Sequence, residues 1–366
     1  MRWPSRERAG EDVADARRTG RPIFVDAWAP WCHSCLSLRS FVLTDPLLAP
    51  LADRYVWLSI DTEKERNAAF VAKFTHESLP TLWVIRGDDE SVLRKWSGTL
   101  TAQELRAMLE GGASAASAVA SVHARVLAAS KDDPAACARL GAHEGPSLPR
   151  GTPRADVLAT ALACAHEARL EAETLALLGL ALEDARRADL LLADDRSALY
   201  EAVVSVMRDR RDPTEAQRVA REWAAFLETE AEGAKDAAAR AVFDPHRVEA
   251  YLALGEPARA IPMLEQSARD FPSDYNPHAR LARVYLEMKR LDEAHAAIAR
   301  AHALVYGPRI LRVASTLADV EEARGERTAA RRAIEAALVR TEGLVLTANQ
   351  QKLRRRLAER ANALGR

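Results

Sequence analysis

Hydrophobic positions are spaced in two ways along the 366 residues of this chain, and the spacing changes near residue 112. In the first part, short apolar runs alternate with stretches in which apolar residues recur every three or four positions. Short runs predict strands, and periodic stretches predict helices. Strands are predicted at 23–27, 56–60, 81–85 and 92–96, and helices at 6–19, 32–44, 46–52, 64–74 and 101–110. This alternation predicts an α/β domain over residues 1–112.

Two of these helices carry further signals. In the helix at 64–74, a stripe formed by Ala68, Val71 and Phe74 predicts the buried face. At the start of the last helix, Thr101 is followed three residues later by Glu104, which predicts a capping box.

Small residues at 111–117 predict a domain boundary, and helical periodicity covers the chain beyond them. The longest interruption is the segment 141–153, which is rich in Gly and Pro. We expect this segment to be a disordered spacer, with a mobile surface element as the alternative. The sequence therefore predicts an all-α domain over residues 113–366.

A repeat of 34 residues is visible in this second part. Tyr251 is followed nine residues later by Ala260, and Tyr285 nine residues later by Ala294. Small residues at repeated positions let paired helices approach, and stacked pairs form a concave surface suited to extended or helical partners. We therefore predict helical repeats, clearest at about 242–342.

The motif with the clearest chemistry is Cys32-His33-Ser34-Cys35, which follows the first apolar run. A cysteine at the start of a helix lies beside free backbone N–H groups and the positive end of the helix dipole. Both favour the thiolate, and such cysteines have pKa values of roughly 3.5–7.5. Cys32 is therefore the predicted nucleophile, and Cys35, one helical turn further on, is the predicted resolving thiol.

Two other interpretations of the motif are half of a zinc site and a pair without redox function. Zinc normally needs a second pair of ligands, and Cys137 and Cys164 stand 27 residues apart in alanine-rich helical sequence. We expect these two to be small apolar core residues, with a second redox pair as the alternative. No metal and no cofactor are expected apart from the redox-active disulfide between Cys32 and Cys35.

The surroundings of the motif resemble the active site of the thioredoxin family. The family pattern is a buried strand ending in Asp, then Trp-Ala-x-Trp-Cys-x-x-Cys, and the stretch from Asp26 to Cys35 matches it. The second mark of the family is a proline with a cis peptide bond that faces the cysteines, and Pro80 stands at that place. Asp61 and Gly98 also fall at family positions. The resemblance covers the first domain and implies a thioredoxin fold, in which a mixed sheet is flanked by helices.

The resemblance implies roles for the matching residues. Asp26 would exchange protons with Cys35, because a carboxylate removed from water has a raised pKa; a half-solvated Asp is the alternative. Trp31 would shield the nucleophile and contact substrates, unless it is an ordinary packing residue. Leu79 and Pro80 would bind an extended substrate, because Pro80 lacks an N–H and a cis bond would leave neighbouring backbone groups free to pair; a trans turn is the alternative.

Two positions depart from the family pattern. His33 and Ser34 stand where thioredoxin itself has Gly-Pro and the isomerases have Gly-His. A histidine near Cys32 stabilises the thiolate and makes the disulfide more oxidising, so we expect a reduction potential above that of thioredoxin. A solvated His33 without redox effect is the alternative. Trp57 stands in place of the lysine that partners the buried Asp, which predicts an altered proton path.

The helical part resembles tetratricopeptide repeats. Leu281, Tyr285, Ala294 and Ala301 lie at pattern positions of one unit, and Pro272 closes the unit before it. A thioredoxin domain followed by such helices is similar in layout to the chaperedoxins, which hold unfolding proteins and protect their cysteines. A solenoid that only stabilises the fold or mediates self-association is the alternative.

Composition and charge narrow the function further. The chain has 52 Lys and Arg against 53 Asp and Glu, so it lacks the basic surplus of a nucleic-acid-binding protein. The sequence has no run of 18 apolar residues, so no membrane span is predicted. No apolar segment of a signal peptide precedes the first predicted helix, so we expect a cytoplasmic location, with the periplasm as the alternative if an upstream export signal was trimmed or missed.

Together these features predict a thiol–disulfide oxidoreductase that acts on protein clients with disulfides or reactive thiols and is recycled by a redox partner. The helical repeats would recruit the clients or bind a separate peptide or protein. A chaperedoxin-like holdase or redox co-chaperone is one alternative, although the intact pair of Cys32 and Cys35 favours turnover. A non-catalytic scaffold is another, although docking alone needs neither Asp26, Trp31 nor Pro80.

Overall fold

The computed structural model describes residues 16–111, 113–149, 151–187, 192–210 and 212–365. Packing divides the chain into two compact units, and neither is one continuous stretch. The described part of the first unit comprises residues 36–52 and 99–256, and that of the second comprises residues 16–35, 53–98 and 257–365. The sequence boundary predicted near residue 112, which itself is not described, stays a prediction.

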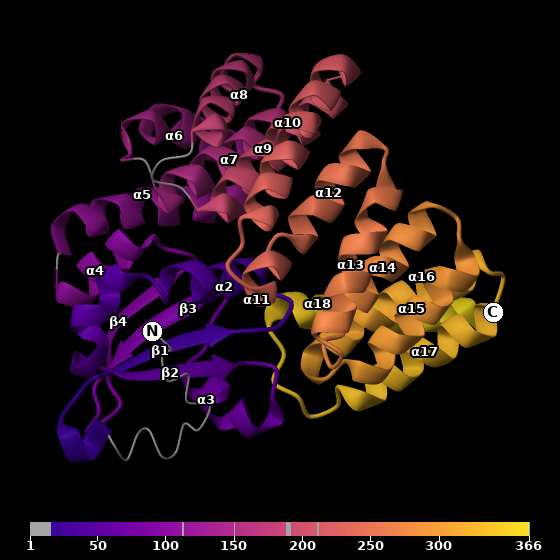
Figure 1. Ribbon diagram of the computed structural model, residues 1–366, viewed down its shortest axis with the longest axis horizontal. Coiled ribbons are helices and arrows are strands. Elements are labelled where there is room, and N and C mark those ends of the chain that lie inside the picture. The colour runs from indigo at the N-terminus through magenta and orange to yellow at the C-terminus, as the bar shows by residue number, and fades with distance from the viewer. Residues whose placement is uncertain (1–15, 112, 150, 188–191, 211, 366) are drawn as a thin grey trace. The chain divides into compact units, whose positions relative to one another are not determined.

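The second unit contains a four-stranded mixed sheet in the order β2-β1-β3-β4 (Figure 1). The strands are β1 (Ile23–Trp28), β2 (Val56–Asp61), β3 (Thr81–Ile85) and β4 (Val92–Ser97). β1 pairs in parallel with β2 and antiparallel with β3, which pairs antiparallel with β4. The central strands β1 and β3 are almost wholly buried, and the edge strand β4 is mostly exposed. The four predicted strands and the predicted mixed sheet are confirmed.

The helix predicted at 64–74 is shorter and turned differently. A 3-10 turn at Glu65–Asn67 leads into α3 (Ala68–Lys73), and Ala68 is exposed. The apolar contact with the sheet comes instead from Phe70 and Phe74, whose rings lie 6.0 and 6.3 Å from that of Trp83 on β3. The predicted stripe is therefore wrong in part, because the 3-10 turn changes the phase of the helix.

The helical stretch after Cys32 consists of α2 (His33–Ser37), one π-helical turn at Leu38–Val42 and a 3-10 helix at Pro46–Arg54. The predicted break before Pro46 is confirmed. In the first unit, the Nζ of Lys235 donates hydrogen bonds to the carbonyl of Ser40 at 2.6 Å and to the hydroxyl of Thr44 at 3.0 Å. The π-helical turn thus places the Ser40 carbonyl where a side chain can donate a hydrogen bond to it.

The predicted capping box is present at the start of α4 (Ala102–Glu110). The Thr101 hydroxyl accepts the Glu104 N–H, and the Glu104 carboxylate accepts the Thr101 N–H. Of the helix predicted at 6–19, only residues 16–19 are described, and these are helical; the rest of that prediction lies outside the described residues.

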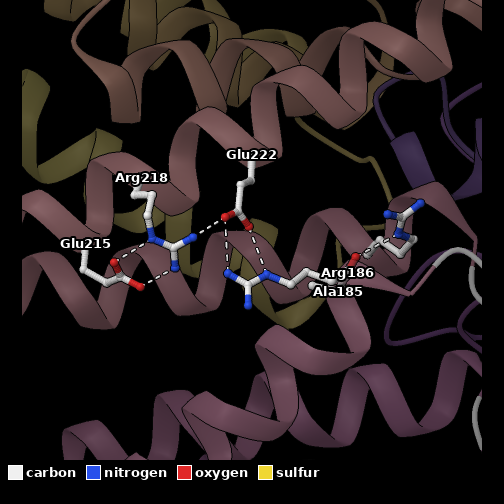
Figure 2. Close-up of polar contacts among 6 residues, drawn as sticks. Ala185, Arg186, Glu215, Arg218 and Glu222 are labelled. Carbon is white, nitrogen blue, oxygen red and sulfur yellow. Dashed lines mark hydrogen bonds and ion pairs between the residues drawn. The ribbon is translucent and has the colours of Figure 1, made fainter.

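The remainder of the first unit is helical. Its helices are α5 (Ala113–Asp132), α6 (Pro134–Glu144), α7 (Thr152–Glu167), α8 (Glu171–Arg186), α9 (Ala193–Asp209), α10 (Pro213–Glu232), α11 (Ala237–Ala241) and α12 (Asp244–Leu254). Consecutive helices from α5 to α10 pack against one another. Figure 2 shows part of the surface of α8 and α10, where Arg186 and Arg218 both bind Glu222, and Arg218 also binds Glu215.

The predicted disordered spacer at 141–153 is wrong for its described residues. Gly141 lies inside α6, and a Cβ atom there would come 2.2 Å from the Cβ of Ala161. A short 3-10 turn, Gly145–Ser147, follows α6 directly. The glycine thus permits the close approach of α6 to α7, although in the sequence it resembles a residue of a flexible loop.

The expectation that Cys137 and Cys164 are core residues is confirmed, but it did not include a bond between them. Both are buried, with exposures of 0% and 5%. They form a disulfide between α6 and α7, with their Cα atoms 6.1 Å apart. Packing these two helices brings the cysteines together although 27 residues separate them.

The second unit ends in six helices: α13 (Ala260–Asp270), α14 (Asn276–Glu287), α15 (Leu291–Leu304), α16 (Ile310–Ala323), α17 (Arg327–Arg340) and α18 (Ala348–Leu364). Each packs against the next, as Figure 1 shows in orange and yellow. The repeated small residues Ala260 and Ala294 are fully buried. The predicted helical repeat is confirmed.

The basic stretch of α18 does not face solvent throughout. Arg360 binds Asp319 at 2.7 Å and also binds Glu322, whereas Lys352 and Arg356 are exposed. Among the described residues, no single helix is long and apolar enough to cross a membrane; by length and composition alone, one sharply bent pair, His33–Val42 with Pro46–Arg54, passes that test.

Candidate active site

The two cysteines of the motif form a disulfide at the start of α2. Their Cα atoms are 5.2 Å apart, and the S–S bond measures 2.03 Å. The backbone N–H of Cys35 points at the Sγ of Cys32 at 3.2 Å, and the Oγ of Ser34 lies 3.5 Å from the same sulfur. In the reduced state, donors at this place stabilise a thiolate on Cys32. Cys32 is 3% exposed and Cys35 is fully buried.

Asp26 lies on β1 and is 2% exposed. The sheet register places it opposite Ser59 on β2 and Leu82 on β3. The Ser59 hydroxyl donates a hydrogen bond to its Oδ2 at 3.4 Å. Burial opposes a charged carboxylate, so this side chain is suited to exchange protons. That role stays a prediction.

The peptide bond between Leu79 and Pro80 is cis. The Pro80 carbonyl accepts a hydrogen bond from the N–H of Gly98 at 2.9 Å. Leu79 packs with Ala29, Cys32 and Cys35 in one apolar cluster, to which Trp31 also belongs. The structure therefore brings together the two cysteines, Trp31 and Leu79, four of the residues predicted for the site. His33 is half-buried at the first position of α2.

Trp31 is held by two groups far from it in the sequence. Its Nε1–H donates a hydrogen bond to Oε1 of Glu63 at 2.8 Å. The guanidinium of Arg309 lies over its ring, 4.7 Å from the ring centroid, which is a cation–π distance. The indole also packs against the apolar core of the C-terminal helices. Trp31 is thus a contact between the active-site loop and the helical repeat, both in the second unit.

Glu63 is a residue of this site that sequence reasoning missed. It is 7% exposed, and its Oε2 accepts the backbone N–H of Arg309 at 3.1 Å. Burial raises the pKa of Glu63 to about 7, and the hydrogen bond from Trp31 and the charge of Arg309 oppose this rise. The only sequence signal was an acidic residue just after β2, a common feature of surface loops.

Neighbouring groups fix the loop that carries Glu63. Asp61 accepts the Glu63 N–H at 3.0 Å and the Tyr306 hydroxyl at 2.7 Å. Gly307 adopts φ of +61°, and a Cβ there would lie 2.4 Å from the carbonyl oxygen of Glu63. Both the backbone conformation and the close approach therefore require glycine at this position.

The active-site loop has one further tie to the repeat. Asn276, the first residue of α14, donates a hydrogen bond from Nδ2 to the carbonyl of Pro30 at 3.1 Å. Asn276 is 4% exposed, so little water competes for this bond. The helical repeat of the second unit thus contacts the active-site loop two residues before the nucleophile.

A pocket of about 480 Å³ opens beside the contact of Trp31 with Arg309. Trp31 and Leu79 form its wall near the disulfide. Arg309 and Arg312 lie in its wall at the start of α16. Residues of α18 and of the loop before it close the pocket: Val345, Leu346, Thr347, Asn349, Gln350 and Leu353. Its volume lies in the range of small-molecule and peptide sites.

Two family models match parts of the chain. Residues 6–87 match a thioredoxin-like family and residues 251–310 match a tetratricopeptide repeat family. The protein therefore contains a thioredoxin-like domain followed by a tetratricopeptide repeat region.

The curated relatives match only a part of this chain. A protein disulfide-isomerase 1 of Dictyostelium discoideum is 27% identical over 96 residues, which are 26% of this chain and 25% of the relative. A thioredoxin of Synechocystis sp. is 30% identical over 77 residues, 21% of this chain and 65% of the relative. The chain thus spans a quarter of the first relative and about two-thirds of the second.

The helices are similar to solved structures at low identity. A thermophilic tetratricopeptide repeat protein of Thermus thermophilus is 18% identical, with a TM-score of 0.32 over 54% of this chain and 96% of the other. A tetratricopeptide repeat protein of Parabacteroides merdae is 15% identical, with a TM-score of 0.38 over 67% and 91% of the two chains.

Proposed function

We propose that this protein is a thiol–disulfide oxidoreductase that exchanges disulfides with protein clients. The observation that carries the proposal is the Cys32–Cys35 disulfide at the start of α2, with a backbone donor on Cys32. The buried carboxyl of Asp26 and the cis peptide before Pro80 lie in the same sheet unit and support it. The relatives named as a thioredoxin and a disulfide isomerase support the same reaction class.

When the protein reduces a client, the exchange has two steps. The thiolate of Cys32 attacks one sulfur of the client disulfide, and the other client sulfur leaves as a thiolate. Cys35 loses its proton and attacks Sγ of Cys32, which releases the second client sulfur and forms the Cys32–Cys35 disulfide. Two electrons pass from the dithiol to the client, and a recycling partner restores the dithiol; oxidation of a client is the same sequence in reverse.

The residues around the disulfide have separate tasks in these steps. The N–H of Cys35 stabilises the attacking thiolate. Asp26 accepts the proton of Cys35 in the second step. Trp31 and Leu79 cover the disulfide and present apolar surface to the client. The helical repeat, which contacts Trp31 and Pro30, holds the client chain.

The test is a trapping experiment with the full chain in cells. Cys35→Ser should leave Cys32 in stable mixed disulfides with clients, which mass spectrometry identifies. Cys32→Ser is the matched control and should give no adducts. Discrete adducts that depend on Cys32 support the enzyme, and the compartment of the trapped clients tests the expected cytoplasmic location.

The same experiment distinguishes the oxidoreductase from the alternative of a chaperedoxin-like holdase. Partners that are recovered without a covalent bond, equally with the wild-type chain and with Cys32→Ser, would contradict the oxidoreductase and favour a chaperedoxin-like holdase or a scaffold.

A further inference from the structure

Three arginines gather where the helical repeat contacts the active-site loop. Arg309 precedes α16, Arg312 lies in its first turn, and Arg280 lies on α14. Burial lowers the pKa of Arg309, Tyr275 and Glu63 oppose this, and the charges of Arg312 and Arg280 lower it further, so the three guanidinium groups act on one another. Within the described residues, neither Arg280 nor Arg312 forms an ion pair with an acid. Repulsion of this kind is relieved when an anion binds.

Two acids line the same pocket, and the charge of one of them, Glu63, acts on Arg309. Glu63 is buried and already accepts hydrogen bonds from Trp31 and from the backbone of Arg309. Glu77 is exposed. Burial and the nearby charge of Lys95 lower the pKa of His76, which keeps this third titratable group neutral near pH 7. The side chain of Arg312 is exposed and available to a ligand.

The position of the pocket identifies the ligand. Its inner wall, Trp31 and Leu79, belongs to the apolar cluster around Cys32 and Cys35. A polypeptide whose sulfur is bonded to Cys32 must leave the disulfide along one of its sides, and this pocket opens there. Successive residues of an extended chain are at most about 3.6 Å apart. Two or three residues of such a chain span at most about 7 to 11 Å.

We propose that this pocket binds the client segment next to the disulfide under attack, and that Arg312 selects an acidic side chain in that segment. The proposal rests on the proposed oxidoreductase function and deepens it. An apolar residue of the client packs on Trp31 and Leu79, and a carboxylate two or three positions from the cysteine pairs with the guanidinium of Arg312. The helical repeat would thus act in substrate specificity at the site itself.

The experiment compares two disulfide-linked peptides that differ in one residue, Glu or Lys, at the third position from the cysteine. The reduced full chain is assayed with each peptide and with a small uncharged disulfide. We expect kcat/KM for the Glu peptide to exceed that for the Lys peptide by about tenfold at low salt, and the ratio to fall at high salt.

Arg312→Gln should reduce that ratio to about one and leave the small disulfide unaffected. Arg312→Lys should keep part of the preference, because the charge remains. Arg356→Gln is the matched control, since Arg356 is exposed on α18 and does not line the pocket; it should keep the full ratio. Equal rates for the two peptides in the wild-type chain, or a preference that survives Arg312→Gln, would overturn the proposal.

A binding measurement separates this proposal from the enzyme itself. The same peptides with the cysteines replaced by serine are titrated into the full chain, and tryptophan fluorescence follows binding. Tighter binding of the Glu peptide that depends on Arg312 supports the pocket even if the small disulfide is not turned over. Equal binding of the Glu and Lys peptides contradicts it even if turnover is normal.

Discussion

The protein has two disulfides, and their surroundings differ more than their burial does. The exposures of the four cysteines lie between 0% and 5% in both pairs. The Cys32–Cys35 pair closes a separation of 3 residues at the start of a helix, whereas the Cys137–Cys164 pair joins two helices across 27 residues. Burial alone therefore does not separate a reactive disulfide from a structural one.

The polar groups nearby make the difference. At the first pair, the sulfur of Cys32 faces the N–H of Cys35 and the hydroxyl of Ser34. At the second pair, the Thr160 carbonyl oxygen lies 4.0 Å from the sulfur of Cys137, and a hydrogen-bond acceptor disfavours a thiolate. The first site thus stabilises the charged intermediate of exchange, and the second does not.

Replacing the nucleophile is expected to have the largest effect and tests the comparison directly. Cys32→Ala should lower the rate of thiol exchange by more than about a thousandfold, because no other sulfur is placed to attack. The double variant Cys137→Ala with Cys164→Ala should keep the rate within about twofold. Reduction of a small disulfide measures the rates, and circular dichroism checks the fold. Full activity of Cys32→Ala, or loss of activity in the double variant, would break the distinction.

For the free energy of unfolding, we expect the Cys137–Cys164 disulfide to matter more than the Cys32–Cys35 disulfide. A disulfide stabilises by restricting the unfolded chain, and a separation of 27 residues gives about 3.5 kcal/mol, against about 2 kcal/mol for the short loop of the active pair. The Cys137 and Cys164 double variant should therefore lose more stability than the Cys32 and Cys35 double variant. Denaturant unfolding of the oxidised proteins measures this difference. The comparison fails if the two double variants unfold at the same denaturant concentration.

Only part of this difference is predictable from the sequence. The four strands, the capping box at Thr101 and the redox motif follow from local patterns, so the sequence identifies them. The pairing of Cys137 with Cys164 depends on how α6 and α7 pack, and Gly141, which permits that packing, has the signal of a loop. Local periodicity cannot distinguish a glycine at a close helix contact from a glycine in a turn.

The candidate site shows the same limit. Cys32, Cys35, Asp26 and Pro80 lie in segments whose pattern is local, and the sequence alone indicates each of them. It indicates neither Glu63 nor Arg309, because they are 246 residues apart and nothing in either segment points to the other. Their meeting depends on the placement of α16 beside the active-site loop within one compact unit.

Because Glu63 is buried beside the active-site loop, we expect the stability of the protein to depend on pH through this residue. Its pKa is raised from 4.5 to about 7, so the folded chain binds a proton that the unfolded chain has released between these values. Protonated Glu63 therefore stabilises the fold at pH 5, and this contribution is lost as the pH rises through 7. The free energy of unfolding should change by about 2 to 3 kcal/mol from this residue between pH 5 and pH 8.

Glu63→Gln should remove that change, because the amide does not titrate. Its single oxygen can replace only one of the two carboxylate oxygens that accept from Trp31 and from the Arg309 N–H, so the variant should be less stable at both pH values but should lose the pH dependence. Denaturant unfolding at both pH values measures the effect for each protein. Glu77→Gln is the control, since this acid of the same pocket is exposed. If the wild-type chain and Glu63→Gln show the same pH dependence, Glu63 is not the titrating group.

The smallest expected effect concerns the contact of the repeat with the active-site loop. Asn276→Ala removes the hydrogen bond to the Pro30 carbonyl at 3.1 Å and leaves that carbonyl without this donor. A buried hydrogen bond contributes about 1 kcal/mol, so stability should fall by about that amount. Because Pro30 lies two residues before Cys32, we also expect kcat/KM for a protein client to fall about two- to fivefold. Asn362→Ala, on the exposed face of α18, should change neither quantity. A change near the Cys137–Cys164 disulfide should not affect the exchange rate. Thr160→Ala, at a half-buried position beside Cys137, tests this expectation. If it lowers the exchange rate as much as Asn276→Ala does, the surroundings of the two disulfides do not differ in their effect on exchange.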